Sequence, residues 1–270
     1  MSEEQSRARV AVVTGAARGI GRRVALALAE RGYAVAANDL SPPEEVVIEL
    51  EQVGAEVLAI PGDVSDEETV REMIRNLING FGRVDVLVNN AGISTILPAE
   101  QTTLAEWNRA LAVNLTGPFL MCRDFGKEML RQGSGSIVNI SSVAGLLGIA
   151  DRAAYNTSKH GLIGLTRTLA AEWGGRGVRV NAVCPGWVKT DMDQEDQTSG
   201  GYTDADIEGR TPMGRFARPE DVAQAVVFLA DPNQSGYVNG HTLSVDGGWY
   251  GDGSWESLRR HKQGEGHTET

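Results

Sequence analysis

Hydrophobic residues along the chain follow two alternating patterns. Short apolar runs rich in β-branched residues are typical of strands buried on both faces of a parallel sheet. Longer stretches between them repeat apolar residues every three or four positions, as helices do. These patterns predict strands over residues 10–14, 33–38, 57–60, 84–88, 137–140, 178–183 and 242–245. They predict helices over residues 20–31, 42–52, 67–78, 104–131, 153–174 and 221–229.

This alternation predicts an α/β fold: a doubly wound, Rossmann-type parallel sheet of about seven strands flanked by helices. The length of 270 residues suits one domain, and no repeat or linker marks a second. We therefore expect a single domain over residues 1–250 and a polar, mobile tail over 251–270. Residues 191–212 stand apart because they are polar, glycine-containing and only weakly periodic.

The charge balance limits the possible ligands. The formal net charge is -11, and the only basic run, residues 259–262, lies in the predicted tail. Nucleic acid is therefore not an expected partner, because a phosphate-binding groove needs a basic patch. An anionic ligand would have to be held locally, by backbone N–H groups and a helix terminus.

The remaining composition favours a cytoplasmic protein with no membrane partner. The N-terminus is polar and no stretch approaches 18 apolar residues. Cys122 and Cys184 lie in apolar surroundings and are interpreted as small buried hydrophobic residues. No metal site is predicted, because the four histidines, at 160, 241, 261 and 267, have no ligand spacing.

A glycine-containing segment follows the first predicted strand and opens the first helix. In this segment, residues 14–21, Gly15 permits a tight turn and Gly19 lets the backbone approach a pyrophosphate. Gly21 lets the helix pack close to the sheet. The spacing differs from G-x-G-x-x-G, so by this pattern alone an ordinary strand–helix turn remains the alternative to nucleotide binding.

An acidic residue at the end of the second strand bears on the choice of cofactor. Asp39 lies 24 residues after Gly15, where a carboxylate can accept hydrogen bonds from the adenosine ribose and repel the 2′-phosphate of NADP. Its alternative role is to cap the following helix. Arg18 favours NADP instead, because a guanidinium in the loop could bind that 2′-phosphate. We give Asp39 the greater weight and expect NAD.

These features resemble the short-chain dehydrogenase/reductase family. The match runs from about residue 10 to residue 248, with its motifs in the family's usual order and spacing. Those motifs are Thr-Gly-x-x-x-Gly-Ile-Gly at 14–21, Asn-Asn-Ala-Gly at 89–92, Ser141-Ser142, Tyr-Asn-Thr-Ser-Lys at 155–159, and Pro185-Gly186 with Thr190 four residues on.

The resemblance implies specific roles for these positions. Asp63 and Val64 would border the adenine ring, and the turn at 185–190 would hold the nicotinamide carboxamide. It also implies a homotetramer. The full set of expected cofactor contacts is Gly15, Arg18, Gly19, Ile20, Asp39, Asp63, Val64, Asn90, Gly92, Tyr155, Lys159, Pro185, Gly186, Val188 and Thr190.

Tyr155 is the expected acid/base of an alcohol–ketone interconversion. A tyrosine has an unperturbed pKa of about 10, too high for an effective base at neutral pH. Lys159, four residues later, lies on the same helical face, and its charge would lower that pKa. A tyrosine and a lysine at this spacing occur often by chance on surface helices. The surrounding motifs are what make a catalytic pair the favoured interpretation. His160 points to another face and is interpreted as structural or surface.

Two further residues complete the expected catalytic set. Ser142 follows the strand over 137–140, where its hydroxyl can bond the substrate oxygen and stabilise developing charge. By resemblance Ser142 is the catalytic serine, with Ser141 its structural neighbour. Asn114 matches the family's fourth catalytic residue, which holds a water in a proton relay to the lysine. Without that role it would simply weaken the predicted helix over 104–131.

The substrate is less well defined by the sequence. Residues 191–212 follow the nicotinamide turn and are expected to form a lid, with Trp187 lining the substrate pocket. Segments at 170–173, 211–215 and 245–249 resemble family members that act on sugars and polyols, but also 3-oxoacyl reductases. A non-catalytic dinucleotide sensor and an epimerase-type relative are further alternatives. The intact catalytic set argues against the sensor, and the glycine spacing against the epimerase.

Overall fold

Seven parallel strands form one sheet in the order β3-β2-β1-β4-β5-β6-β7. The computed structural model describes residues 8–200 and 202–255, so most of the predicted tail, including the basic run at 259–262, lies outside the described residues. The strands are β1 (Val10–Thr14), β2 (Ala34–Asn38), β3 (Val57–Ala59), β4 (Val86–Asn89), β5 (Gly135–Ile140), β6 (Val178–Pro185) and β7 (Thr242–Val245). All seven predicted strands are confirmed, with small shifts at their ends.

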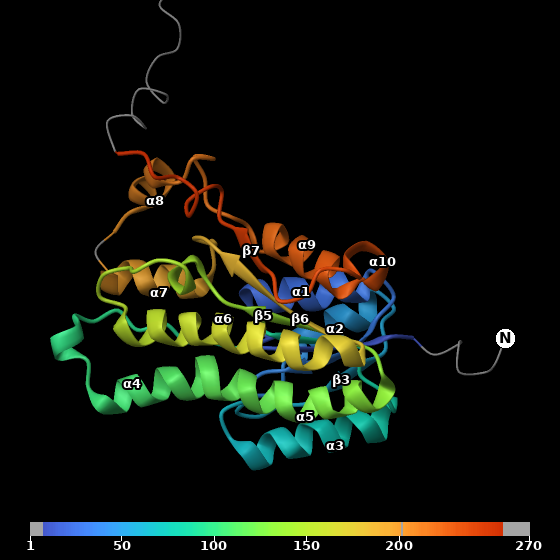
Figure 1. Ribbon diagram of the computed structural model, residues 1–270. Coiled ribbons are helices and arrows are strands. Elements are labelled where there is room, and N and C mark those ends of the chain that lie inside the picture. The colour runs from blue at the N-terminus through green and yellow to red at the C-terminus, as the bar shows by residue number, and fades with distance from the viewer. Residues whose placement is uncertain (1–7, 201, 256–270) are drawn as a thin grey trace, which may run out of the picture.

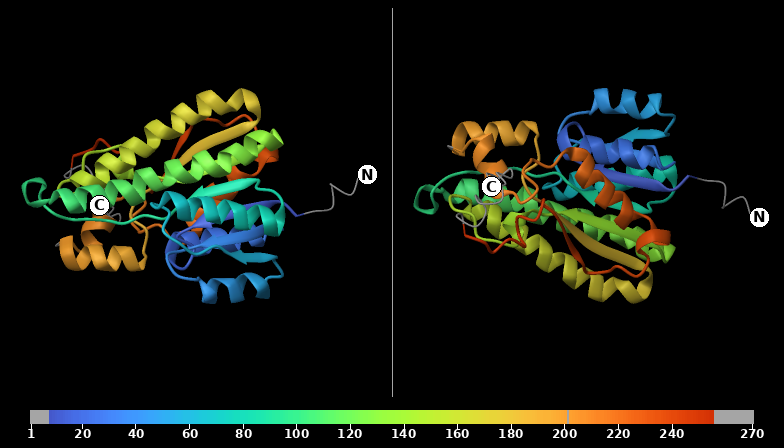
Figure 2. Two further views of the ribbon diagram at one scale, coloured as in Figure 1. Left: turned by 90° about the horizontal axis from the view of Figure 1, so that it is seen from below. Right: turned by 90° about the horizontal axis from the view of Figure 1, so that it is seen from above.

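Helices cover both faces of the sheet (Figures 1 and 2). The helices of these two layers are α1 (Gly19–Ala29), α2 (Glu44–Gln52), α3 (Glu67–Phe81), α4 (Leu104–Leu111), α5 (Gly117–Gln132), α6 (Ala153–Trp173) and α9 (Pro219–Ala230). Side chains alternate along each strand: Ala11 and Val13 of β1 pack with α1, α2 and α9, whereas Val10 and Val12 pack with α3, α5 and α6. A strand buried on both faces must be apolar at consecutive positions, which explains its sequence.

The predicted helix over residues 104–131 is wrong in one respect. It consists of α4 and α5, joined by η3 (Ala112–Thr116), a π-helical turn. Asn114 lies within this turn and is fully buried. Its side chain bonds the backbone N–H and C=O of Ile93, which fixes the turn against the loop after β4. Single π turns inside helices often occur at functional sites.

Residues 191–212 contain two helices that their weak periodicity did not predict. They are α7 (Asp191–Gly200) and α8 (Asp204–Arg210), which begins with a capping box between Thr203 and Asp206. Both lie at the end of the sheet where β6 ends (Figure 1). The short helix α10 (Pro232–Ser235) follows α9. The start of the predicted tail is tied down, because Asp252 forms an ion pair with Arg210 of α8.

A chain of buried amides and a hydroxyl links the centre of the sheet to α6. Asn89 of β4 donates to Asn139 of β5 at 2.8 Å, and Asn139 donates to the Thr166 hydroxyl of α6 at 2.9 Å. Asn139 and Thr166 are fully buried. Because α6 carries Tyr155 and Lys159 and β5 leads to Ser142, this chain fixes the relative position of the expected catalytic residues.

We predict that Asn139→Ala lowers the free energy of unfolding by about 1–3 kcal/mol, because Asn89 and Thr166 each lose a partner in a dry interior. Urea unfolding at fixed protein concentration measures this. The control is Asn108→Ala on the exposed side of α4, which should change stability by no more than about 0.5 kcal/mol. Equal stability of the two variants would show that the buried chain does not hold β5 and α6 together.

Candidate active site

A cavity of about 320 Å³ lies at the carboxyl ends of the strands, between the glycine loop, the start of α6 and α7. Sheets of this kind bind ligands at this edge, where the strand order reverses. Ser142 and Trp187 line the cavity, whereas Asn114 does not. The lining also includes the full set of expected cofactor contacts: Gly15, Arg18, Gly19, Ile20, Asp39, Asp63, Val64, Asn90, Gly92, Tyr155, Lys159, Pro185, Gly186, Val188 and Thr190.

The glycine loop is held closely against the end of β4. Asn90 Nδ2 donates to the Thr14 carbonyl at 2.9 Å, and the Thr14 hydroxyl accepts from the backbone N–H groups of Asn90 and Ala91 at 3.0 Å. Gly15 has a φ of +63°, and a Cβ there would lie 2.9 Å from Ala91 Cα. A Cβ at Gly21 would lie 2.0 Å from the Gly15 carbonyl oxygen. Gly21 therefore allows close packing against the loop itself, in addition to the expected approach to the sheet.

The N-terminus of α1 suits an anionic group. No side chain caps it, so its first backbone N–H groups and the positive end of the helix dipole are available to a ligand at this edge. Together with the close approach at Gly15, this arrangement fits a dinucleotide pyrophosphate.

Asp39 faces the glycine loop. Its carboxylate accepts hydrogen bonds from the backbone N–H groups of Ala17 and Leu40, both at 2.9 Å. The alternative role as a helix cap is wrong, because α2 begins at Glu44 with Pro43 at its N-cap. Asp39 lines the cavity beside Gly15.

Arg18 is directed towards α7. Its Nη1 lies 3.6 Å from Asp191 Oδ2 and 3.4 Å from Glu195 Oε1 on α7. The guanidinium therefore has two carboxylates as partners, which weakens its earlier interpretation as a reader of a 2′-phosphate.

Asp63 sits at the expected adenine end of the cavity. It accepts hydrogen bonds from the N–H and hydroxyl of Ser65 and from Arg109. Burial works to raise the pKa of Asp63, but these hydrogen bonds outweigh it and the pKa is lowered. Asp63 is thus held as a carboxylate in a fixed orientation.

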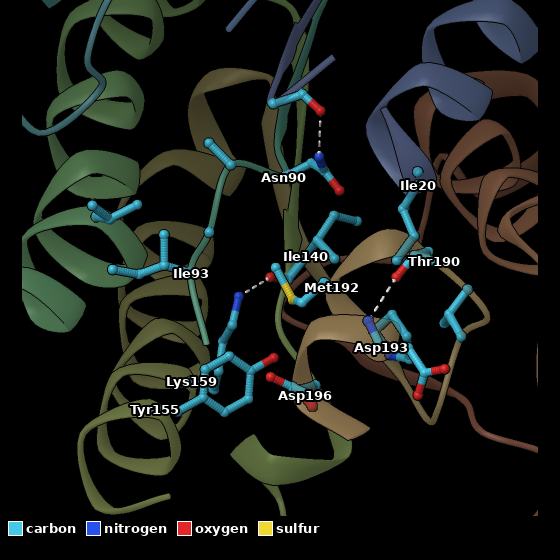
Figure 3. A pocket seen from close by; sticks show the side chains of 18 of the residues that line it. Ile20, Asn90, Ile93, Ile140, Tyr155, Lys159, Thr190, Met192, Asp193 and Asp196 are labelled. Carbon is cyan, nitrogen blue, oxygen red and sulfur yellow. Dashed lines mark hydrogen bonds between the residues drawn. The ribbon is translucent and has the colours of Figure 1, made fainter. Parts of the chain in front are cut away.

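Tyr155 and Lys159 lie one turn apart on α6 and face the cavity together (Figure 3). The Lys159 side chain is 4% exposed, and its ammonium donates to the Ile140 carbonyl at 2.9 Å. Lys159 Nζ lies 5.6 Å from the centroid of the Tyr155 ring. Ser142 begins the short helix η4 (Val143–Gly145), where its hydroxyl accepts from the Ala144 N–H at 3.1 Å.

The pKa of Tyr155 differs from the sequence-based expectation. Burial raises it above its ordinary value, while the hydrogen bond with Ser142 and the charge of Arg152 lower it to a lesser extent. Burial lowers the pKa of Lys159 to about 8. The expected lowering of the Tyr155 pKa is therefore not found, because burial of the phenol, together with the negative charge of Asp196, outweighs the Ser142 hydrogen bond and the charge of Arg152. The two groups lie close enough for their titrations to be coupled.

Asn114 acts behind the cavity wall. Its amide bonds both backbone groups of Ile93 and donates to the Ser158 hydroxyl at 3.2 Å. A Cβ on Gly92 would lie 3.2 Å from Asn114 Oδ1 and 3.6 Å from Lys159 Nζ. Asn114 is therefore adjacent to the environment of Lys159, and its role in a proton relay stays a prediction. His160 is exposed, as expected.

Two charged residues beside Tyr155 were missed by the sequence reasoning. Arg152, three residues before Tyr155, is 8% exposed and pairs with Asp196 of α7 at 2.9 Å. Both line the cavity. The position of Arg152 within one turn of Tyr155 could have drawn attention to it, but its partner comes from a helix that the periodicity did not predict.

Trp187 is held from outside the cavity. Its ring stacks on the Trp249 ring, with centroids 4.3 Å apart. The guanidinium carbon of Arg210 lies 4.7 Å from the centroid of the Trp249 ring. The segment after β7 therefore supports the cavity wall. Met192, Asp193 and Tyr202, from residues 191–212, add further lining.

Within the described ranges, no group of three or more His, Cys, Asp or Glu side chains is arranged to hold a metal ion. No helix in this part of the chain is long and apolar enough to cross a membrane. Cys122 and Cys184 are free and buried, as predicted.

Comparisons with known proteins agree with this geometry. A family model described as enoyl-(acyl carrier protein) reductase matches residues 15–250. D-threitol dehydrogenase from Mycolicibacterium smegmatis is 43% identical over 244 residues, which are 89% of this chain and 92% of that protein. A 3-oxoacyl-[acyl-carrier-protein] reductase from Synechocystis is 41% identical, covering 89% of this chain and 96% of its own.

A solved structure from Beutenbergia cavernae extends the similarity to three dimensions. It is described as an NAD(P) dependent gluconate 5-dehydrogenase with bound NADP at low occupancy. It is 43% identical, has a TM-score of 0.85, and covers 92% of this chain and 98% of its own. The sequence, the sheet order and these matches agree, and the chain belongs to the short-chain dehydrogenase/reductase family of oxidoreductases.

Proposed function

We propose that this chain is an NAD(H)-dependent enzyme that interconverts a secondary alcohol and a ketone, with Tyr155 as general acid/base and a sugar or polyol as substrate. The observation that carries the proposal is the convergence of Ser142, Tyr155 and Lys159 on the cavity that the glycine loop also lines. A bound nicotinamide dinucleotide would supply the hydride donor or acceptor. The chain's own residues then have to orient the substrate and move one proton.

The proton is assigned to the Tyr155 hydroxyl. In ketone reduction the phenol donates its proton to the oxygen that becomes negative, and in alcohol oxidation the phenolate accepts it. The Ser142 hydroxyl, which is fixed by the Ala144 N–H, is placed to stabilise charge on that oxygen. Lys159 is buried beside the ring, so its ammonium favours the phenolate more strongly than it would in water.

We predict that Tyr155→Phe lowers kcat by about 10²–10⁴-fold while NAD still binds, because only the hydroxyl is lost. Lys159→Met should also abolish most turnover, and should weaken NAD binding more than Tyr155→Phe does. Steady-state kinetics and fluorescence titration of NAD measure both effects. Tyr237→Phe, at a fully exposed tyrosine, is the matched control. If Tyr155→Phe kept most of its activity, another group would carry the proton.

The proposed preference for NAD rests on Asp39. Its carboxylate is oriented by two backbone N–H groups beside Gly15, and Arg18 already has Asp191 and Glu195 as partners. A 2′-phosphate would meet the carboxylate without a free counter-charge from Arg18. Bringing like charges together in a binding site costs several kcal/mol of binding free energy.

We expect a higher kcat/KM with NAD than with NADP on the best substrate. Asp39→Ser should raise the NADP/NAD ratio of kcat/KM by at least about tenfold, because it removes the repulsion. Glu45→Gln, on the exposed side of α2, should leave the ratio unchanged. A wild-type preference for NADP would contradict the assignment and would make Arg18 the dominant reader.

We further propose a cytoplasmic homotetramer. Met121 of α5 and Ala154 of α6 are buried within the chain's own core and are not available to an interface. Phe119 of α5 and Leu104 of α4 are 43% and 73% exposed, and they support association through this helix layer.

Light scattering at micromolar concentration should give a particle of four chains. A particle of 28.8 kDa, the mass of one chain, would contradict the tetramer. Because removal of an apolar contact weakens association, Phe119→Glu should shift the distribution towards smaller particles. Phe228→Glu on α9, at an aromatic residue of similar exposure (37%), is the comparison that locates the interface.

A further inference from the structure

A buried ion pair forms the wall of the cavity beside Tyr155. Arg152 Nη1 donates to Asp196 Oδ2 and to the Ser94 hydroxyl, both at 2.9 Å. Ser94 donates to the same carboxylate oxygen at 3.1 Å. The guanidinium carbon of Arg152 lies 5.9 Å from the centroid of the Tyr155 ring. This cluster therefore joins α6, the loop after β4 and the lid helix α7 at the place where a substrate oxygen would meet Tyr155.

The cluster keeps unused hydrogen-bonding capacity. Every hydrogen bond of Asp196 to a described residue falls on Oδ2, so Oδ1 can accept another. The hydrogen bonds of Arg152 to described side chains use Nη1, which leaves Nε and Nη2 as donors. Figure 3 shows the Asp196 carboxylate beside the Tyr155 hydroxyl. The cavity lining beside Tyr155 thus contains one carboxylate with an acceptor to spare and one guanidinium with donors to spare.

The charges of the cavity wall disfavour an anionic substrate. Among its cations, Arg18 pairs with Asp191 and Glu195, Arg109 with Asp63, and Arg152 with Asp196. The remaining cation within the described lining is Lys159, whose ammonium donates a hydrogen bond to the Ile140 carbonyl.

The lid adds the carboxyl group of Asp193 to this wall. The Asp193 side chain is 5% exposed and is itself paired with Lys189 at 3.5 Å. A substrate carboxylate next to Tyr155 would therefore find the positive charge of Arg152 already compensated by Asp196.

Resting on the proposed alcohol–ketone activity, we propose that Arg152 and Asp196 form a specificity subsite for a neutral polyhydroxylated substrate. Asp196 accepts a hydrogen bond from a hydroxyl next to the reacting carbon, and Arg152 donates to a hydroxyl oxygen of the same substrate. The subsite excludes aldonates, which bring a second negative charge. It also excludes acyl thioesters, whose apolar chain would desolvate the ion pair without replacing its hydrogen bonds.

The test compares threitol and other four- to six-carbon polyols with aldonates of the same carbon number and configuration, using NAD. We expect wild-type kcat/KM to favour the polyol by at least about tenfold. Asp196→Asn keeps the shape of the side chain but leaves Arg152 uncompensated. It should lower this preference at least about tenfold, by raising KM for the polyol and lowering KM for the aldonate.

The control substitution is Glu208→Gln, which makes the same chemical change on the exposed side of α8 and should leave the preference unchanged. The ratio of two substrates separates recognition from damage to the fold, because general destabilisation lowers both activities together. A wild-type preference for aldonates, or equal effects of Asp196→Asn on both classes, would overturn the proposal.

Binding without turnover separates this inference from the proposed reaction. The NAD complex of Tyr155→Phe is titrated calorimetrically with a polyol and with its aldonate, with and without Asp196→Asn. If the polyol binds more tightly and Asp196→Asn removes the difference, the subsite is supported even where wild-type enzyme turns over no alcohol. In that case the proposed reaction alone would be wrong. Equal affinity for the two ligands would refute the subsite.

Discussion

The hydrogen bond between the Lys159 ammonium and the Ile140 carbonyl is the constraint on which the site depends. It joins α6 to the last residue of β5, and the Ser141 hydroxyl reinforces the same junction by donating to the Lys159 carbonyl at 3.0 Å. The buried chain from Asn89 through Asn139 to Thr166 extends this connection into the core. As a result Ser142, at the end of the strand, and Tyr155, on the helix, are held in one geometry by a rigid scaffold.

This anchoring also explains the unusual electrostatics. An ammonium buried to this degree loses most of its hydration, and its pKa falls to about 8. The same desolvation raises the pKa of the neighbouring Tyr155 phenol. Burial thus shifts the two pKa values in opposite directions, each towards the neutral form of its group, whereas the charged form of either group would favour the charged form of the other. Perturbed titratable groups in a cavity are typical of catalytic sites.

Much of this arrangement was predictable from the sequence, because it depends on local chemistry. The glycine loop, the acidic residue after the second strand and the Tyr155–Lys159 spacing are short-range patterns with direct structural consequences. The π-helical turn at Asn114 could not be predicted, since it is fixed by Ile93, a residue distant in sequence. The helices α7 and α8 have few apolar residues, so their periodicity is weak. The Arg152–Asp196 pair depends on α7 and was therefore also missed.

The pH dependence of wild-type alcohol oxidation, beside that of Tyr155→Phe, tests the central claim most directly. A base acts in its deprotonated form, so the oxidation rate should rise with pH through an apparent pKa and then level off. In the complex with NAD and substrate we expect this pKa well below about 10. The charge of Lys159 must then outweigh the burial that raises the pKa of Tyr155 in the chain alone. The rate of ketone reduction should fall over the same range. The residual activity of Tyr155→Phe should lack this transition. The same transition at comparable activity in both proteins would show that Tyr155 does not carry the proton.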